Sequence, residues 1–224
     1  MTTAARGMSS AASALKGKSA PPSTDTEVST DTGAGDGRHA RRDRNRLAVV
    51  DAMLTLYAEG NLDPSSDEIA ERAGLSPRSL FRYFDDLDDL VRVAIARQHE
   101  RLLPMAHLDI NPAPLAERVQ RLVQQRMRLF EAIASVGVVS RVRAPFQPLI
   151  ADELAIARSY LRHQVEQLFA AELAALAAHA PAAVAAIDVL TSFESLQLLR
   201  FDQQLTPAAV EATLARSITL LLEK

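Results

Sequence analysis

The chain has 224 residues, which is enough for one large domain or two small ones. Its formal net charge is −3, so any nucleic-acid site must be a local basic patch. It contains no cysteine, which excludes disulfides, thiolate zinc sites and cysteine nucleophiles.

Alanine and leucine are abundant and tryptophan is absent, which favours an all-α protein. No apolar run approaches the length of a membrane span, and the N-terminus lacks the apolar stretch of a secretory signal. We therefore expect a cytoplasmic protein with no membrane partner.

Residues 1–40 are mostly Ala, Ser, Thr, Gly and Pro, without Phe, Tyr or Trp. Such a segment cannot bury enough surface to offset its ordering entropy, so we expect a disordered tail over 1–40. A passive extension is the simpler interpretation. The alternative is a tail that scans DNA or binds a partner.

A basic run precedes the first predicted helix. Residues 41–46 read RRDRNR. A solvated charge run is the usual interpretation, and contact with DNA phosphates or the minor groove is the alternative. The helix is predicted over 44–59. Its apolar residues recur at steps of three and four, at Leu47, Val50, Leu54 and Tyr57.

A second helix is predicted after a capping box. Ser65 and Glu68 have the spacing in which a serine caps the helix and a glutamate returns the bond. The helix continues through DEIAERA, and Gly74 stands where a C-terminal glycine belongs.

A third helix is predicted over 77–84. Ser76 can cap it, and Pro77 suits its first position. Leu80 and Phe84 lie four apart and can anchor it to a core. Two short helices around a glycine turn predict a helix-turn-helix, whose second helix enters the major groove of DNA. This context makes DNA contact the better interpretation of the preceding arginine run.

The remaining chain predicts only helices. Asp85-Asp86 opens a fourth helix that reaches about Leu103, where Pro104 kinks or ends it. Gly137 weakens the end of the next predicted helix, 115–136, and Thr206 with Pro207 starts the last helix. The further segments are predicted over 115–136, 138–144, 149–179, 181–201 and 206–222.

The chain resembles the TetR family of transcriptional regulators over about 44–97. The resemblance rests on VVDAMLTLYAEG followed by SSDEIAERAGLSPRSLFRYFDDLDDL. It implies an all-α fold with an N-terminal three-helix helix-turn-helix DNA-binding head over 41–90. A C-terminal α-helical ligand-binding and dimerisation domain is implied over 91–224.

The resemblance also assigns roles in DNA binding. Arg78 and Arg82 are the candidates for base edges, because arginine pairs well with guanine. Phe81 stands where the family usually has tyrosine and would contact a thymine methyl or a sugar. Residues implied to hold phosphates or fix register are Arg42, Arg44, Arg46, Ser65, Pro77, Ser79 and Tyr83.

One position departs from the family pattern. Leu87 replaces the usual lysine at the start of the fourth helix and lies between Asp85-Asp86 and Asp88-Asp89. Four carboxylates would repel the DNA backbone. We hypothesise that the arginines of 41–46 compensate, and phosphate binding without them would count against this.

The resemblance implies a small-molecule pocket between the long helices. Arg126 flanks an apolar stripe, and we expect it to snorkel to water. The alternative is that it meets an acidic ligand or an internal carboxylate. The other candidate lining residues are Met127, Phe130, Phe146, Tyr160, His163 and Phe193. Each of these is more often core or surface than ligand contact.

The sequence gives little support for catalysis. No two histidines share a metal-binding helical spacing, and neither a phosphate loop nor a nucleophile elbow is present. We expect no enzyme activity, no metal and no cofactor.

The last two predicted helices carry more apolar residues than one buried face needs. The resemblance therefore implies a homodimer through them, which would present two recognition helices to a near-palindromic DNA site. The implied function is a repressor released from double-stranded DNA by a small-molecule effector. The alternatives are an activator, or a helical ligand-binding or enzymatic protein whose head no longer binds DNA.

Overall fold

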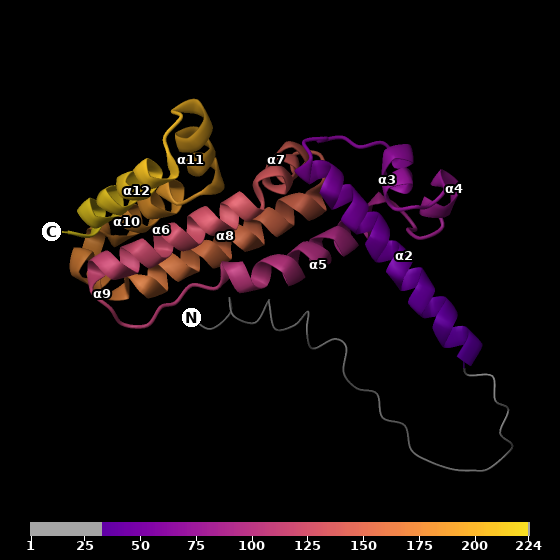
Figure 1. Ribbon diagram of the computed structural model, residues 1–224. Coiled ribbons are helices and arrows are strands. Elements are labelled where there is room, and N and C mark those ends of the chain that lie inside the picture. The colour runs from indigo at the N-terminus through magenta and orange to yellow at the C-terminus, as the bar shows by residue number, and fades with distance from the viewer. Residues whose placement is uncertain (1–32, 224) are drawn as a thin grey trace, which may run out of the picture. The chain divides into compact units, whose positions relative to one another are not determined.

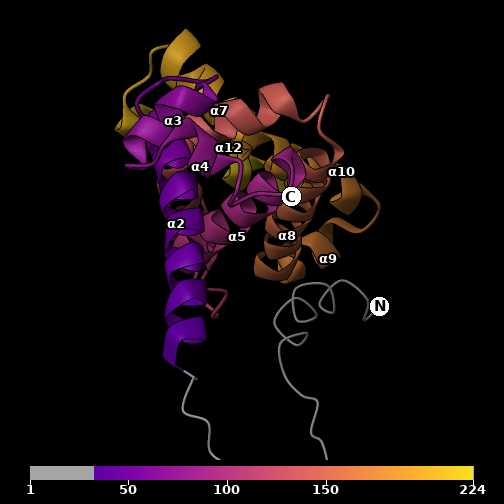
Figure 2. The ribbon, with the colours of Figure 1, turned by 90° about the vertical axis from the view of Figure 1, so that its right-hand side faces the viewer.

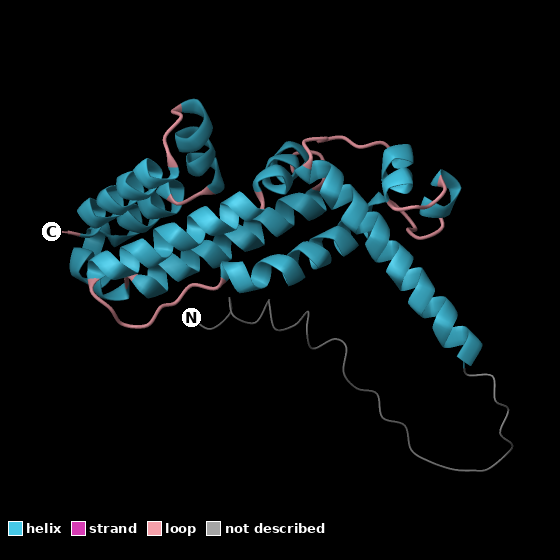
Figure 3. Ribbon diagram, in the orientation of Figure 1, coloured by secondary structure: helices cyan, strands magenta, loops and turns pink. Residues whose placement is uncertain are grey.

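The computed structural model describes residues 33–223, apart from the side chains of 33–38 and of Leu87. All regular elements in that part of the chain are helical, as Figure 3 shows, and the all-α prediction is confirmed. Of the predicted tail, residues 1–32 lie outside the described residues. Residues 33–40 belong to helix α2, so disorder was the wrong prediction for them. A helix that has formed over the arginine run extends upstream at one backbone bond per residue.

The head contains α2 (Gly33–Ala58), α3 (Ser66–Arg72) and α4 (Pro77–Leu80). Figure 2 shows α3 and α4 beside the C-terminal half of α2, and the three helices share one core. Leu47, predicted on the apolar face of α2, is 38% exposed and lies outside that core. The buried face comprises Val49, Val50, Ala52, Met53, Leu54, Leu56 and Tyr57.

The α4 helix is shorter than predicted, because it ends at Leu80 instead of Phe84. The chain continues in tight turns, in which the Arg82 amide donates to the Ser79 carbonyl at 3.1 Å and the Tyr83 amide to the Leu80 carbonyl at 3.0 Å. Such bonds between residues three apart are typical of a tightened helix end.

Asp86 caps helix α5 (Leu87–Ala106), as predicted from the Asp85-Asp86 start, but the helix passes Pro104 before it ends. It packs against α6 (Leu115–Ala132) and α8 (Pro148–Leu168), which run side by side in Figure 1. Helix α7 (Ala134–Arg143) follows α6, and its Val139 joins the head core.

Three helices predicted as continuous are interrupted. The breaks fall at Ile133 (φ −105°, ψ 9°), Phe169 (φ −111°, ψ 23°) and Thr191 (φ −98°, ψ 19°). No glycine or proline marks them, so the apolar pattern continues across each break. The shorter elements that result are α9 (Ala170–Leu176), η1 (Ala177–His179), α10 (Ala180–Leu190), α11 (Phe193–Gln197) and the π-helix η2 (Leu198–Asp202). Helix α12 (Pro207–Leu222) begins at the Thr206 cap, as predicted.

The segment Ala170–Leu190 corrects one expectation, because its length and mean hydropathy of 1.8 suffice for a membrane span. Its alanines produce this value. In the structure the segment is divided among α9, η1 and α10, and Ala177 turns the chain with φ 49°. Leu173, Val184 and Ile187 enter the core, although only 22% of the apolar window is buried within the chain. Length and composition alone are weak evidence for a span, because core helices pass the same test.

An ion cluster joins α7, α8 and α11. The Glu194 carboxylate accepts hydrogen bonds at 2.7 Å from Arg141 and at 2.7 Å from Arg158. Burial raises the pKa of Glu194, but the hydrogen bonds outweigh it and lower the pKa to about 2.

This cluster predicts acid sensitivity. Because the folded pKa of Glu194 lies below its unfolded value, its stabilisation is complete above about pH 4.5 and is lost as pH falls toward about 2. As pH falls over that range, the Tm of Glu194→Gln should decrease less than the Tm of the unchanged chain. Equal slopes for both proteins would contradict the assignment.

Candidate nucleic-acid interface

Helix α3 and the turn that joins it to α4 are built by local chemistry. The Ser65 amide donates to the Glu68 carboxylate at 2.8 Å, and the Glu68 amide donates back to the Ser65 hydroxyl at 3.3 Å, which confirms the capping box. The Ser65 hydroxyl bond to Glu68 is the main reason that the pKa of Glu68 is lowered. Gly74 has φ +67°, a left-handed conformation that glycine adopts without strain.

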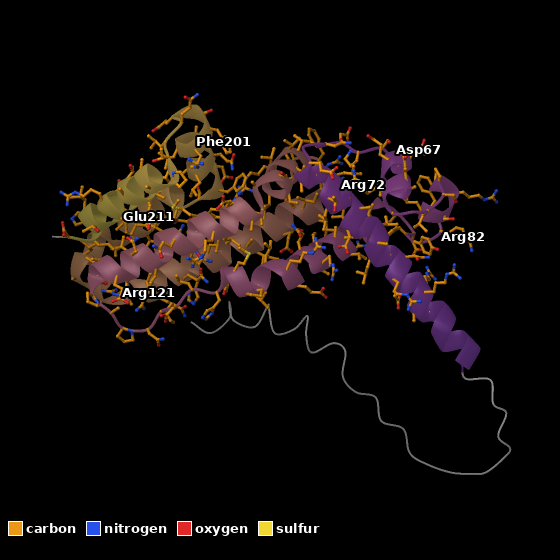
Figure 4. The ribbon with its side chains drawn as sticks, in the orientation of Figure 1. Asp67, Arg72, Arg82, Arg121, Phe201 and Glu211 are labelled. Carbon is orange, nitrogen blue, oxygen red and sulfur yellow. The ribbon has the colours of Figure 1, made fainter. Side chains whose placement is uncertain are left out.

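The α4 segment is anchored from within and presents cations outward. Leu80 and Phe84 are buried in the head core, as predicted. Arg78 and Arg82 are exposed and form no ion pair with the side chains that the structure describes. Phe81 is 67% exposed, and Arg82 lies at the α4 end of the head (Figure 4).

Two serines order the start of α4. The Ser79 amide donates to the Ser76 hydroxyl at 3.3 Å, and their hydroxyls lie 2.8 Å apart. Pro77 occupies the first helical turn, as predicted. Ser65 caps the start of α3, whereas Pro77 and Ser79 belong to α4, and both Ser65 and Pro77 are exposed.

Arg46 has a partner that sequence reasoning missed. Its guanidinium lies 2.7 Å from the Asp89 carboxylate and 5.0 Å from the centre of the Phe84 ring. Burial raises the pKa of Asp89, but hydrogen bonds from Arg46 and the Asp85 amide outweigh it, and the pKa is lowered. Arg42 and Arg44 are exposed. Of the three arginines, Arg46 is thus engaged within the head.

Tyr83 is also tied to α2. The side-chain amide of Asn45 donates to its hydroxyl at 2.6 Å. The hydroxyl keeps its own proton for a further acceptor. No sequence signal pointed to this pair, because the two residues are far apart in the chain.

The aspartates after Phe84 are partly used in capping. Asp86 accepts the Asp89 amide at 2.7 Å, and Asp89 accepts the Asp85 amide at 3.2 Å. The α5 start thus uses two of the carboxylates expected to repel phosphates. The side chain of Leu87 lies outside the described residues.

Helix α5 is clamped to α2. Asp51 accepts hydrogen bonds from Arg97 at 3.1 and 3.2 Å and from Arg101 at 2.7 Å. A separate ion pair joins Arg143 of α7 to Asp63 at 2.6 Å. A movement of α5 would therefore be transmitted to α2 through these hydrogen bonds.

The candidate ligand residues do not form one group. Phe130 and Phe193 are buried with ring centres 5.8 Å apart, and Met127 packs on the same core. Tyr160 is half-buried. Phe146 is 83% exposed, and His163 is exposed with Glu166 3.5 Å away, so the structure does not bring these two into the core.

Arg126 is 1% exposed, so the prediction that it snorkels to water was wrong. It lies in the middle of α6, where neighbouring helices cover it and polar acceptors are within reach. Gln125 and Gln164 are those acceptors, and sequence reasoning missed both. The available signal was the polar pair at 125 and 126 inside an apolar stripe.

Residues 49–94 match the model of a family described as "Bacterial regulatory proteins, tetR family". This segment is similar to the DNA-binding head of TetR-family regulators. The match extends from the buried half of α2 through α3 and α4 into α5, which are the elements that position Arg78 and Arg82. A comparison with curated proteins gave no match.

Solved structures of TetR-family proteins share the fold. A TetR transcription regulator from Haloarcula marismortui has a TM-score of 0.57 at 17% identity, over 80% of this chain and 96% of that one. A protein from Rhodococcus sp. assigned to the TetR family has a TM-score of 0.54 at 18% identity, over 80% of this chain and 99% of that one. The TetR-like fold thus extends beyond the head into the C-terminal helices.

Proposed function

We propose that this TetR-like regulator is a cytoplasmic, homodimeric repressor that a small-molecule effector releases from a near-palindromic operator. The observation that carries the DNA-binding part is the α4 segment, which Leu80 and Phe84 anchor while Arg78 and Arg82 stay exposed. Arg78 and Arg82 would read guanine edges in the major groove. Ser65, Ser79 and the Tyr83 hydroxyl would bind phosphates, and exposed Phe81 would contact a thymine methyl or a sugar.

The proposed dimer uses the last part of the chain. A surface hollow between α10 and α12 is lined mainly by apolar side chains, among which Val189 is 63% exposed and Leu220 is 54% exposed. A second copy that covered this hollow would remove both from water. The low burial of the Ala170–Leu190 window within one chain agrees with such a partner. The molar mass in solution, measured by light scattering, tests it.

The arginines of α2 should separate by role. Arg42→Ala and Arg44→Ala should each make the negative slope of log K against log salt shallower by about 0.9, because each removes one phosphate contact. Arg46→Ala should leave that slope unchanged and lower stability by about 1 kcal/mol, because it removes the Asp89 pair and the contact with Phe84. DNA titrations at several salt concentrations and thermal unfolding measure the two effects.

Repression is tested by transcription from the gene's own upstream DNA. A reporter should be less active when the protein is present, and Arg78→Ala with Arg82→Ala should restore its activity. A reporter that became more active would favour an activator. If the protein bound the DNA but reporter activity did not change, the protein would not be a repressor of that promoter.

A further inference from the structure

Arg126 is a cation in the interior of the C-terminal helices. It is 1% exposed, and its neighbours one helical turn away on α6, Leu122 and Phe130, are buried. Burial lowers the pKa of Arg126 to about 10, so it stays charged at neutral pH. A buried charge is unfavourable unless a counter-charge and hydrogen bonds compensate it.

The hydrogen-bond partners of Arg126 are all neutral. Its guanidinium donates to the side-chain oxygens of Gln125 and Gln164, the latter at 2.8 Å, and to the Leu161 carbonyl at 2.8 Å. No carboxylate among the described residues lies within ion-pair distance of it. The more distant Asp188 carboxylate attracts Arg126 electrostatically. The Asp188 carboxylate lies 4.0 Å from Arg162.

The two glutamines connect this cation to the end of α5. Gln125 donates its amide to the Met105 carbonyl at 2.9 Å, and Gln164 donates to the Ala106 carbonyl at 2.8 Å. These carbonyls belong to the last turn of α5, where they lack partners within the helix. Each glutamine thus joins the guanidinium on one side to α5 on the other.

Helix α5 also contacts the head. Asp51 of α2 binds Arg97 and Arg101 in the second half of α5, and Leu90 and Ala94 in the first half enter the head core. A change at the end of α5 is therefore connected by direct contacts to the helix-turn-helix. The contacts with the two glutamines and the contacts with the head core are therefore both made by α5.

We propose that Arg126 binds the carboxylate of an effector that is a monocarboxylic acid with an apolar body. This rests on the proposed function and names the chemistry of its effector. A carboxylate accepts two parallel bonds from a guanidinium and supplies the missing counter-charge. The apolar residues around Arg126 suit the rest of such a molecule. The acid replaces the glutamine oxygens, so Gln125 and Gln164 are freed from Arg126 and their hold on α5 changes.

The test uses the full chain and a panel of hexanoate, decanoate and benzoate, each paired with its alcohol (hexanol, decanol and benzyl alcohol). At saturation, at least one acid should raise the Tm by about 5 °C or more, and its alcohol should raise it far less. The same acid should weaken DNA binding about 5- to 150-fold. Arg126→Met should lose the acid response. Arg128→Met, an exposed arginine on the same helix, should keep it.

Several results would overturn the proposal. These are no response to any acid, equal responses to acid and alcohol, or an unchanged acid response in Arg126→Met. If Arg126→Met does not fold, Arg126→Lys keeps the charge and should retain a weaker acid response, whereas its full retention or complete loss would overturn the bidentate contact. A chain that never binds DNA fails the proposed function instead, and the Tm comparison still decides whether Arg126 binds carboxylates.

Discussion

Replacing Arg78 and Arg82 together by alanine is expected to weaken specific DNA binding at least about 30-fold, because each well-placed arginine supplies about 1–3 kcal/mol of base discrimination. Both side chains are exposed and form no ion pair with the described side chains, so the fold should not depend on them. Binding to non-specific DNA should fall much less, since phosphate contacts dominate it. Titrations of specific and random duplexes measure both affinities.

Arg128→Ala provides the control for this pair, because it removes one exposed arginine from α6, outside the head. It should bind both duplexes like the unchanged chain. Circular dichroism and Tm should be unchanged for the double variant. If it still preferred the specific duplex to the same extent, α4 would not be the element that reads sequence.

Gly137→Ala is expected to destabilise the C-terminal domain by about 1–3 kcal/mol, the usual cost of overpacking a filled core. A Cβ at Gly137 would lie 2.6 Å from Cε2 and 2.7 Å from Cζ of Phe193. That ring is 2% exposed, stacks edge-on against Phe130 and lies under Arg141, whose guanidinium is 4.0 Å from its centre. It therefore has little freedom to move.

Thermal or urea unfolding measures this effect, with a Tm decrease of about 2–4 °C for each kcal/mol. Phe193→Leu serves as the second arm of a double-mutant cycle. The two changes together should destabilise less than the sum of the single changes, because leucine makes room for the added methyl group. Additive losses would mean that the Gly137 effect does not come from the Phe193 ring.

The head could be predicted closely because its signals are local. Ser65 with Glu68 and Ser76 with Pro77 specify helix starts through atoms within one turn of the chain, and outside the head Thr206 with Pro207 does the same for α12. The Ser76 cap and Pro77 also made it possible to predict which short helix presents Arg78 and Arg82.

The parts that could not be predicted depend on distant contacts. Phe169 interrupts a long apolar pattern where it enters the core with no exposed surface. Arg46 lies in a charge run, and only folding brings it to Asp89, 43 positions away. Burial of Arg126 likewise depends on Gln164 from another helix. Spacing along one helix cannot supply such partners.

The most direct measurement is binding of the purified full chain to its own upstream DNA, by mobility shift over a salt series with excess random DNA as competitor. We predict a complex that survives the competitor, about 10³-fold or more tighter than random DNA, and that weakens steeply as salt rises. If neither the upstream DNA nor any sequence selected from a random pool is preferred over the competitor, the chain is not a sequence-reading regulator.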